Sequence, residues 1–123
     1  MVQQQTKTGQ IRVRPELRVQ VAPTTFLVPD VTLLDRNRPI EKIATHPPVA
    51  VFEILSPTDT LKRVMTKCGQ YERMGIQTIM VIDPDGPKYN FVAGRLEPVE
   101  LRAFDLPGSS ARFDLDEIEK LLD

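Results

Sequence analysis

The chain has 123 residues, of which 41% are hydrophobic and 27% are charged, and it contains one cysteine. This length supports one hydrophobic core but not two, and the composition is that of an ordinary globular domain. No apolar run approaches the roughly 20 residues that cross a bilayer, and no signal-peptide pattern stands at the start. A lone cysteine excludes an internal disulfide, so we expect a cytoplasmic protein.

Charge is divided unevenly along the chain. Residues 1–75 hold 11 Lys/Arg and 7 Asp/Glu, a net charge of +4, whereas residues 76–123 hold 5 and 10, a net charge of −5, and the total is −1. The total net charge disfavours a protein that binds nucleic acid tightly. The basic excess of the first part fits a phosphate-bearing substrate without requiring one.

The first part of the chain predicts two strands. Residues 1–10 are polar and without periodicity, so we expect a flexible N-terminus there. Alternating apolar residues over 11–21 indicate a half-buried strand that Pro15 could break. After a short turn, residues 26–34 form a second predicted strand, in which Pro29 indicates an edge or a bulge.

The centre of the chain predicts a strand, a helix and a second strand. We expect a short helical turn over 40–45 and then a strand over 49–55. The helix begins in the capping signal at 56–59 and ends at Gly75, a typical C-cap residue. An uninterrupted apolar run over 77–82 indicates an interior strand, which would complete a parallel βαβ crossover.

The last part of the chain predicts a hairpin and a short helix. Two strands, over 88–93 and 95–104, would meet at Gly94. Asp114 opens a pattern that resembles a capping box, and the helix that follows would end near Leu122. The elements together predict an α/β fold with a sheet of five to six strands and one main helix.

One carboxylate, Glu53, stands in the middle of an apolar strand. Burial of a carboxylate is costly unless a charged or hydrogen-bonding group meets it. Asp30 follows the earlier apolar run, and Lys67 lies at the border of the helix's apolar stripe, one turn before Tyr71. Two carboxylates and a nearby ammonium are the groups that a metal-dependent phosphodiester-cleaving site needs.

The residues alone leave structural roles open for each of these side chains. Glu53 could form a buried ion pair with Arg14 or Arg18. Asp30 could be a turn residue, Lys67 could be a solvated surface lysine, and Tyr71 could be a core residue. Cys68 lies on the apolar stripe with no base beside it, which predicts an unreactive core thiol.

Four motifs, in this order and spacing, resemble the Uma2 family: Pro29-Asp30, Glu53-Ile-Leu-Ser56-Pro57, Lys67-x-x-x-Tyr71-x-x-x-Gly75 and Val81-Ile-Asp83-Pro84. This is a group of bacterial restriction-endonuclease-like proteins within the PD-(D/E)XK nuclease superfamily. The resemblance implies a restriction-endonuclease-like mixed sheet with one main crossover helix and a short C-terminal helix. It implies a single domain over 11–123 that lacks the family's usual N-terminal helical part.

The resemblance also implies roles for individual residues. Asp30 and Glu53 match the two acidic metal ligands, for Mg²⁺ or Mn²⁺, and the backbone carbonyl of Ile54 could complete the inner shell. The superfamily's usual lysine position holds Leu55 in this chain. In the Uma2 family a lysine on the following helix takes the role of that lysine, and Lys67 matches it. Asp30, Glu53 and Lys67 are therefore the catalytic residues that the resemblance predicts.

The implied function is a Mg²⁺-dependent endonuclease that hydrolyses DNA and acts as a homodimer. Tyr71 would support Lys67 or contact phosphate. Contacts to the DNA backbone are predicted for five basic residues: Arg12, Arg14, Arg18, Lys62 and Arg63. The alternative is a catalytically inactive relative that serves as a DNA-binding or protein-interaction module. The expected lack of the N-terminal part favours this alternative, whereas the three retained catalytic residues favour the enzyme.

Overall fold

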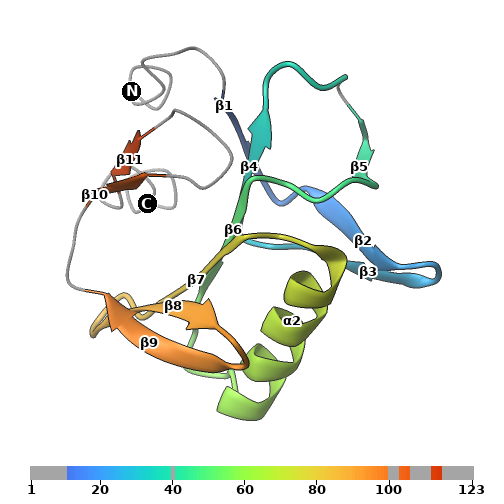
Figure 1. Ribbon diagram of the computed structural model, residues 1–123. Coiled ribbons are helices and arrows are strands. Elements are labelled where there is room, and N and C mark those ends of the chain that lie inside the picture. Colours follow the sequence, from blue (N-terminus) through green and yellow to red (C-terminus); the bar gives the residue numbers. More distant parts are fainter. Residues whose placement is uncertain (1–10, 40, 100–102, 106–111, 115–123) are drawn as a thin grey trace.

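The computed structural model describes residues 11–39, 41–99, 103–105 and 112–114 (Figure 1). Its centre is a six-stranded mixed sheet in the order β1-β4-β6-β7-β8-β9. These strands are β1 (Ile11–Pro15), β4 (Val31–Asp35), β6 (Ala50–Ile54), β7 (Thr78–Ile82), β8 (Lys88–Val92) and β9 (Arg95–Val99). The mixed α/β sheet predicted from the sequence is confirmed.

Smaller elements pack around this sheet. A three-stranded sheet has the order β3-β2-β5, formed by β2 (Arg18–Ala22), β3 (Thr25–Leu27) and β5 (Ile43–Ala44). The main helix is α2 (Leu61–Met74), and β10 (Ala103–Asp105) pairs with β11 (Arg112–Asp114). In Figure 1, α2 and the β2–β3 hairpin lie on one side of the large sheet and β10–β11 on the other. Within the described ranges, no helix has the length and apolar character needed to cross a membrane.

The first four strands form one long antiparallel hairpin that bends in its middle. β1 pairs with β4 and β2 pairs with β3, so the break expected at Pro15 is confirmed. Pro29 lies between β3 and β4, where the single strand expected over 26–34 is interrupted, and not at an edge or a bulge within one strand. The bend falls at Glu16 and Asp30, where the Glu16 N–H donates to the Asp30 carbonyl at 3.3 Å. Glu16 has a φ of 51°, which is uncommon for a residue with a side chain. This bend places Asp30 at the start of β4.

The predicted parallel βαβ unit is formed by β6, α2 and β7, and β6 pairs with β7 over its full length. The helix ends as predicted at Gly75, which has a φ of 105°. It begins slightly later than expected, because Asp59 accepts the Ser56 N–H at 2.8 Å and closes a turn there. The N-cap is Thr60, whose Oγ1 accepts the Arg63 N–H at 3.2 Å.

Each face of the large sheet carries an apolar core. On one face, side chains of α2 pack on β6 and β7, and the buried members are Val51, Val64, Cys68, Tyr71, Ile76, Ile79, Val81 and Phe91. The other face buries Ile11, Val31, Leu33, Ala50, Phe52, Met80 and Ile82. Because β7 is buried on both faces, its sequence is an unbroken apolar run. The position of Cys68 in the core is confirmed, and burial raises the pKa of its thiol to about 12.

Two expectations for irregular regions are wrong. The segment expected as a helical turn over 40–45 contains β5 instead, because Ala44 is buried and pairs in parallel with Val19 of β2. The strand expected over 95–104 is β9, which spans Arg95–Val99. Its residue Val99 pairs with Lys88, the first residue of β8, so the hairpin of these two strands ends there. Residues 103–105 pair with 112–114 instead.

Two further expectations lie outside the described residues. These are the flexible N-terminus over 1–10 and most of the helix expected from Asp114 to Leu122. Asp114 itself is the last residue of β11.

Substitution by alanine should have opposite effects at two glycines, one inside α2 and one at its C-cap. Gly75→Ala should destabilise the protein by about 1 kcal/mol, because a side chain disfavours the left-handed conformation. Its added Cβ would meet Pro47 at 3.5 Å, an ordinary contact, so the cost lies in the backbone. Gly69→Ala, inside the helix, should stabilise by about 0.5–1 kcal/mol. Urea unfolding measures both, and shifts of the same sign would contradict the assigned helix end.

Candidate active site

Asp30 and Glu53 lie opposite each other at the end of the β4–β6 ladder. The last ladder pair is Val31 with Phe52, and the next position on each strand holds one carboxylate. Asp30 Oδ2 accepts the Ile54 N–H at 2.6 Å, so this side chain takes the place of a backbone carbonyl where the ladder ends. Asp30 therefore has a structural role as well as its predicted chemical one.

Glu53 is buried, with 6% of its surface exposed, and each of its oxygens meets a side chain from α2. The Tyr71 hydroxyl donates to Oε2 at 2.6 Å. Lys67 Nζ lies 3.7 Å from Oε1, and the lysine side chain is 32% exposed. The two partners stand four residues apart, which puts them on one face of the helix. Among the described residues, neither Arg14 nor Arg18 pairs with Glu53.

The surroundings of Glu53 make its ionisation costly. Burial raises its pKa, the Tyr71 hydrogen bond and the charge of Lys67 lower it by less, and the negative charge of Asp30 raises it further. Burial and the neighbouring Glu53 raise the pKa of Tyr71, so its hydroxyl stays protonated and acts as a permanent donor. A buried carboxylate with a raised pKa beside a second carboxylate is a common feature of functional sites.

The carboxylate pair could hold a hard divalent cation. Mg²⁺ is usually bound by one or two carboxylates and keeps several waters. No group of three or more His, Cys, Asp or Glu side chains suited to a metal gathers among the described residues, so the site would be open rather than a closed cage. A cation there would offset the charge repulsion that raises the pKa of Glu53. Asp30, Glu53 and the Ile54 carbonyl fit this role.

Two polar residues near the carboxylates were not predicted to belong to the site. Asp59 accepts hydrogen bonds from the Ser56 backbone and hydroxyl, and its negative charge also raises the pKa of Glu53. Thr32 stands two positions after Asp30 on β4, where its buried hydroxyl has no hydrogen-bond partner among the described residues. The sequence held one signal for Thr32: it stands two positions from Asp30 in a predicted strand, and residues with this spacing lie on the same face of a sheet.

The five predicted DNA-backbone residues fall in three places. Arg12 lines a cleft away from the carboxylates. Arg14 and Arg18 line a hollow beside the bend of the long hairpin. Lys62 and Arg63 are exposed on the first turn of α2, the helix that carries Lys67.

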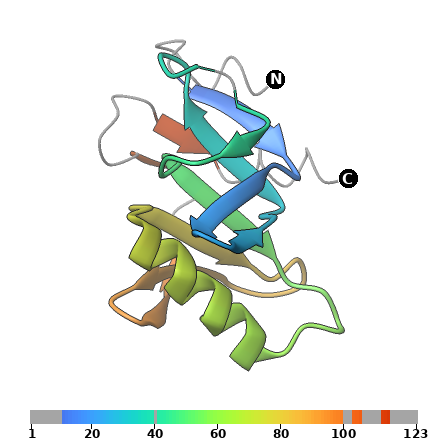
Figure 2. The same ribbon diagram turned by 90° about the vertical axis from the view of Figure 1, so that its right-hand side faces the viewer.

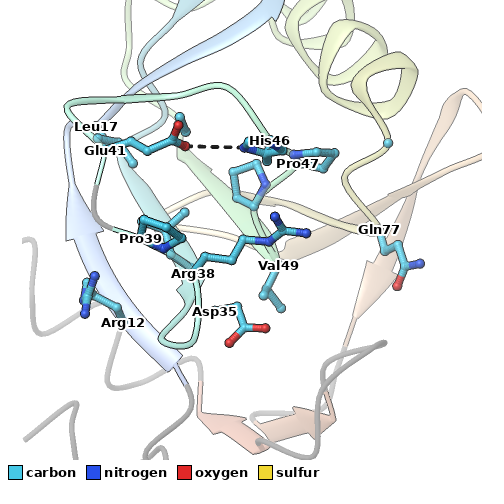
Figure 3. A pocket seen from close by; sticks show the side chains of 14 residues that line it. Arg12, Leu17, Asp35, Arg38, Pro39, Glu41, His46, Pro47, Val49 and Gln77 are labelled. Atoms are coloured by element: carbon cyan, nitrogen blue, oxygen red, sulfur yellow. Dashed lines mark ion pairs between the residues drawn. The ribbon is translucent and has the colours of Figure 1, made fainter.

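The cleft that Arg12 lines has a volume of about 310 Å³ and is not the candidate site. Figure 3 shows Arg38 reaching across it and Glu41 facing His46, with 3.7 Å between Glu41 Oε1 and His46 Nδ1. Its walls include Val49 and Gln77, next to the first residues of β6 and β7. Glu53 stands near the last residue of β6, so the cleft and the carboxylates lie at opposite ends of this strand.

The mixed sheet, its crossover helix and the paired carboxylates are typical of restriction-endonuclease-like nucleases. The family described as "Uma2: Putative restriction endonuclease" matches residues 1–101. The chain therefore belongs to the Uma2 family, as the four motifs implied.

One solved structure supports the same fold. The crystal structure described as "a putative nuclease belonging to DUF820 from Anabaena variabilis" is similar with a TM-score of 0.71 and 20% identity, over 99% of this chain and 75% of that one. A cryo-EM structure of a DrdV–DNA complex aligns with a TM-score of 0.49 and 17% identity, over 98% of this chain and 10% of that one. This second likeness is too low to carry an argument. Comparison with curated proteins finds no match.

The raised pKa of Glu53 predicts a pH-dependent loss of stability. The folded state binds this proton more tightly than the unfolded chain, so stability falls as the pH rises from the ordinary value of 4.5 through the raised pKa. Glu53→Gln keeps an oxygen that accepts from Tyr71 and removes the charge. Above the raised pKa it should be more stable than the wild type by on the order of 1 kcal/mol.

Thermal unfolding at a series of pH values measures this difference. The wild type should lose stability toward alkaline pH more steeply than Glu53→Gln. Glu97→Gln, at an exposed carboxylate of β9, is the matched control and should follow the wild type. A Glu53→Gln protein that is less stable at every pH would contradict the assigned cost of the buried charge.

Proposed function

We propose that the protein is a Mg²⁺-dependent endonuclease that hydrolyses phosphodiester bonds in DNA. The observation that carries this proposal is the meeting of four groups at one point. Glu53 is buried, Asp30 stands opposite it, and Lys67 and Tyr71 reach it from α2. Membership in the nuclease-like family supports the reaction class. A cytoplasmic location and a homodimer remain predictions from the sequence.

The roles of the residues follow from their chemistry. When bound, the divalent ion neutralises the scissile phosphate and activates the attacking water. Asp30 and Glu53 would provide its side-chain ligands, with the Ile54 carbonyl beside them. Lys67 is one third exposed and 3.7 Å from Glu53, so its long side chain can turn toward a substrate. There its ammonium would stabilise the negative charge that develops on the phosphate.

Tyr71 would act as a positioning residue for Glu53. Its hydroxyl holds Oε2 from inside the core, which leaves Oε1 on the side of Lys67. This contact favours support of the metal ligand over the two roles first considered, which were support of Lys67 and contact with phosphate. Supporting hydrogen bonds of this kind fix the orientation of metal ligands.

An inactive relative that binds DNA or another protein is the second candidate. Its support is that Glu53 already has a hydrogen bond and an ion pair from its own chain, which is what a purely structural carboxylate needs. Leu55 at the superfamily's usual lysine position also favours it. The two candidates differ in whether metal-dependent cleavage occurs.

Cleavage of supercoiled and linear DNA with Mg²⁺ or Mn²⁺ tests the nuclease proposal. Glu53→Gln and Asp30→Asn should each lower the rate by about 100-fold or more, because each removes a charged ligand. Glu97→Gln should cleave like the wild type, and chelation of the metal should stop the reaction. Cleavage that Glu53→Gln leaves unchanged would overturn the assigned site. Absence of cleavage by the folded wild type would favour the inactive relative.

Tyr71→Phe tests the positioning role. Loss of the hydroxyl leaves Glu53 Oε2 without its donor and should cost about 1–3 kcal/mol of stability. Metal affinity, followed by a Mn²⁺ titration of cleavage, should fall by about tenfold or more. Tyr89→Phe, at the half-buried tyrosine of β8, is the control. A Tyr71→Phe protein that loses stability but keeps its metal affinity would reduce Tyr71 to a structural residue.

A further inference from the structure

A basic hollow lies beside the bend of the long hairpin. It has a volume of about 420 Å³, and its polar walls are Arg14, Arg18, Lys42 and Glu16. Three cationic side chains and one carboxylate give these walls a net charge of +2. None of the three cations forms an ion pair with another described residue. The hollow therefore presents positive charge that the described chain does not compensate.

Strand pairing assembles this charge from distant parts of the sequence. Arg18 opens β2 and pairs in register with Ile43 of β5, so Lys42 is brought next to Arg18. Arg14 comes from β1, on the other side of the bend at Glu16. The hollow thus lies between the ends of β1, β2 and β5, and the pairing of β2 with β5 sets the positions of Arg18 and Lys42.

The same bend joins the hollow to the candidate active site. Glu16 lines the hollow, and its N–H donates to the carbonyl of Asp30 at 3.3 Å. Val28, another lining residue, stands two positions before Asp30. In Figure 2 the bend between β1 and β2 and the end of β6 lie on the same side of the molecule, at the right. The cleft of Figure 3 lies at the opposite end of β6.

We propose that this hollow binds a backbone phosphate of the DNA, next to the phosphate held at Asp30 and Glu53. The inference rests on the proposed nuclease function and names the path that the substrate follows across the protein. Guanidinium and ammonium groups bind phosphate oxygens through charge-assisted hydrogen bonds. Such contacts position a nucleic acid without reading its sequence. Of the five predicted basic residues this selects Arg14 and Arg18, and it adds Lys42.

Salt-dependent DNA binding tests the hollow without cleavage. The probe is a fluorescent duplex of about 20 base pairs, titrated in chelator between about 50 and 200 mM salt. The test protein is Arg18→Gln with Lys42→Gln, because both residues are exposed and their loss should leave the fold intact. The control is Arg36→Gln with Arg95→Gln, which removes the same charge at two other exposed positions.

We expect the test protein to bind roughly tenfold more weakly than the wild type. The slope of log affinity against log salt should shrink by about 1 to 2. The control should keep most of the wild-type affinity and slope. Equal losses in the two double variants would overturn the subsite, because binding would then follow net charge alone. A wild type that does not bind the duplex would overturn it as well.

Cleavage with Mg²⁺ separates this inference from the nuclease proposal. If the wild type binds through the hollow but does not cleave, the subsite stands and the nuclease proposal fails. If the wild type cleaves and the test protein has the same KM as the control, the subsite fails while the nuclease proposal stands. The expected result is a higher KM in the test protein with an unchanged kcat.

Discussion

The burial of the Glu53 carboxylate is the constraint on which the rest of the structure depends. An unpartnered carboxylate inside a sheet costs several kcal/mol, so the fold has to bring a donor and a cation to it. The crossover helix does both, because Tyr71 and Lys67 share one of its faces. The contacts of these two side chains with Glu53 therefore help to fix which face of α2 is turned toward the sheet. Thr60 and Gly75 then set where the helix starts and stops.

In the candidate site, Asp30 combines a structural role with its proposed chemical role, whereas the charge of Glu53 is costly for folding. Asp30 closes the β4–β6 ladder through Ile54 and at the same time puts a second negative charge beside Glu53. For folding alone, a neutral side chain would serve better at position 53, because the pKa of Glu53 is raised. A domain that keeps such a charge has a lower free energy of unfolding, and a loss of stability of this kind is common where residues are retained for activity. The family membership agrees with this interpretation.

The sequence predicted the parts of the molecule whose structure depends on local patterns. The apolar strand around Glu53, the helical spacing of Lys67 and Tyr71, and the cap at Gly75 are all visible in neighbouring residues. The structure of β5 is not, because its two residues become a strand only by pairing with β2. The Asp30–Ile54 hydrogen bond depends on where a ladder between distant strands ends. Lys42 reaches the basic hollow through the same long-range pairing, and nothing near it in the sequence marks it.

The central claim is that Asp30 and Glu53 hold a divalent cation at the end of β6. Paramagnetic broadening of backbone amide signals by Mn²⁺ tests this directly, because the effect falls steeply with distance from the ion. The signals of Asp30 and Ile54 should disappear first in the wild type and should persist in Glu53→Gln at the same Mn²⁺ concentration. Broadening that begins at another acidic segment, such as the turn at 83–87, or that is equal in the two proteins, would contradict the claim.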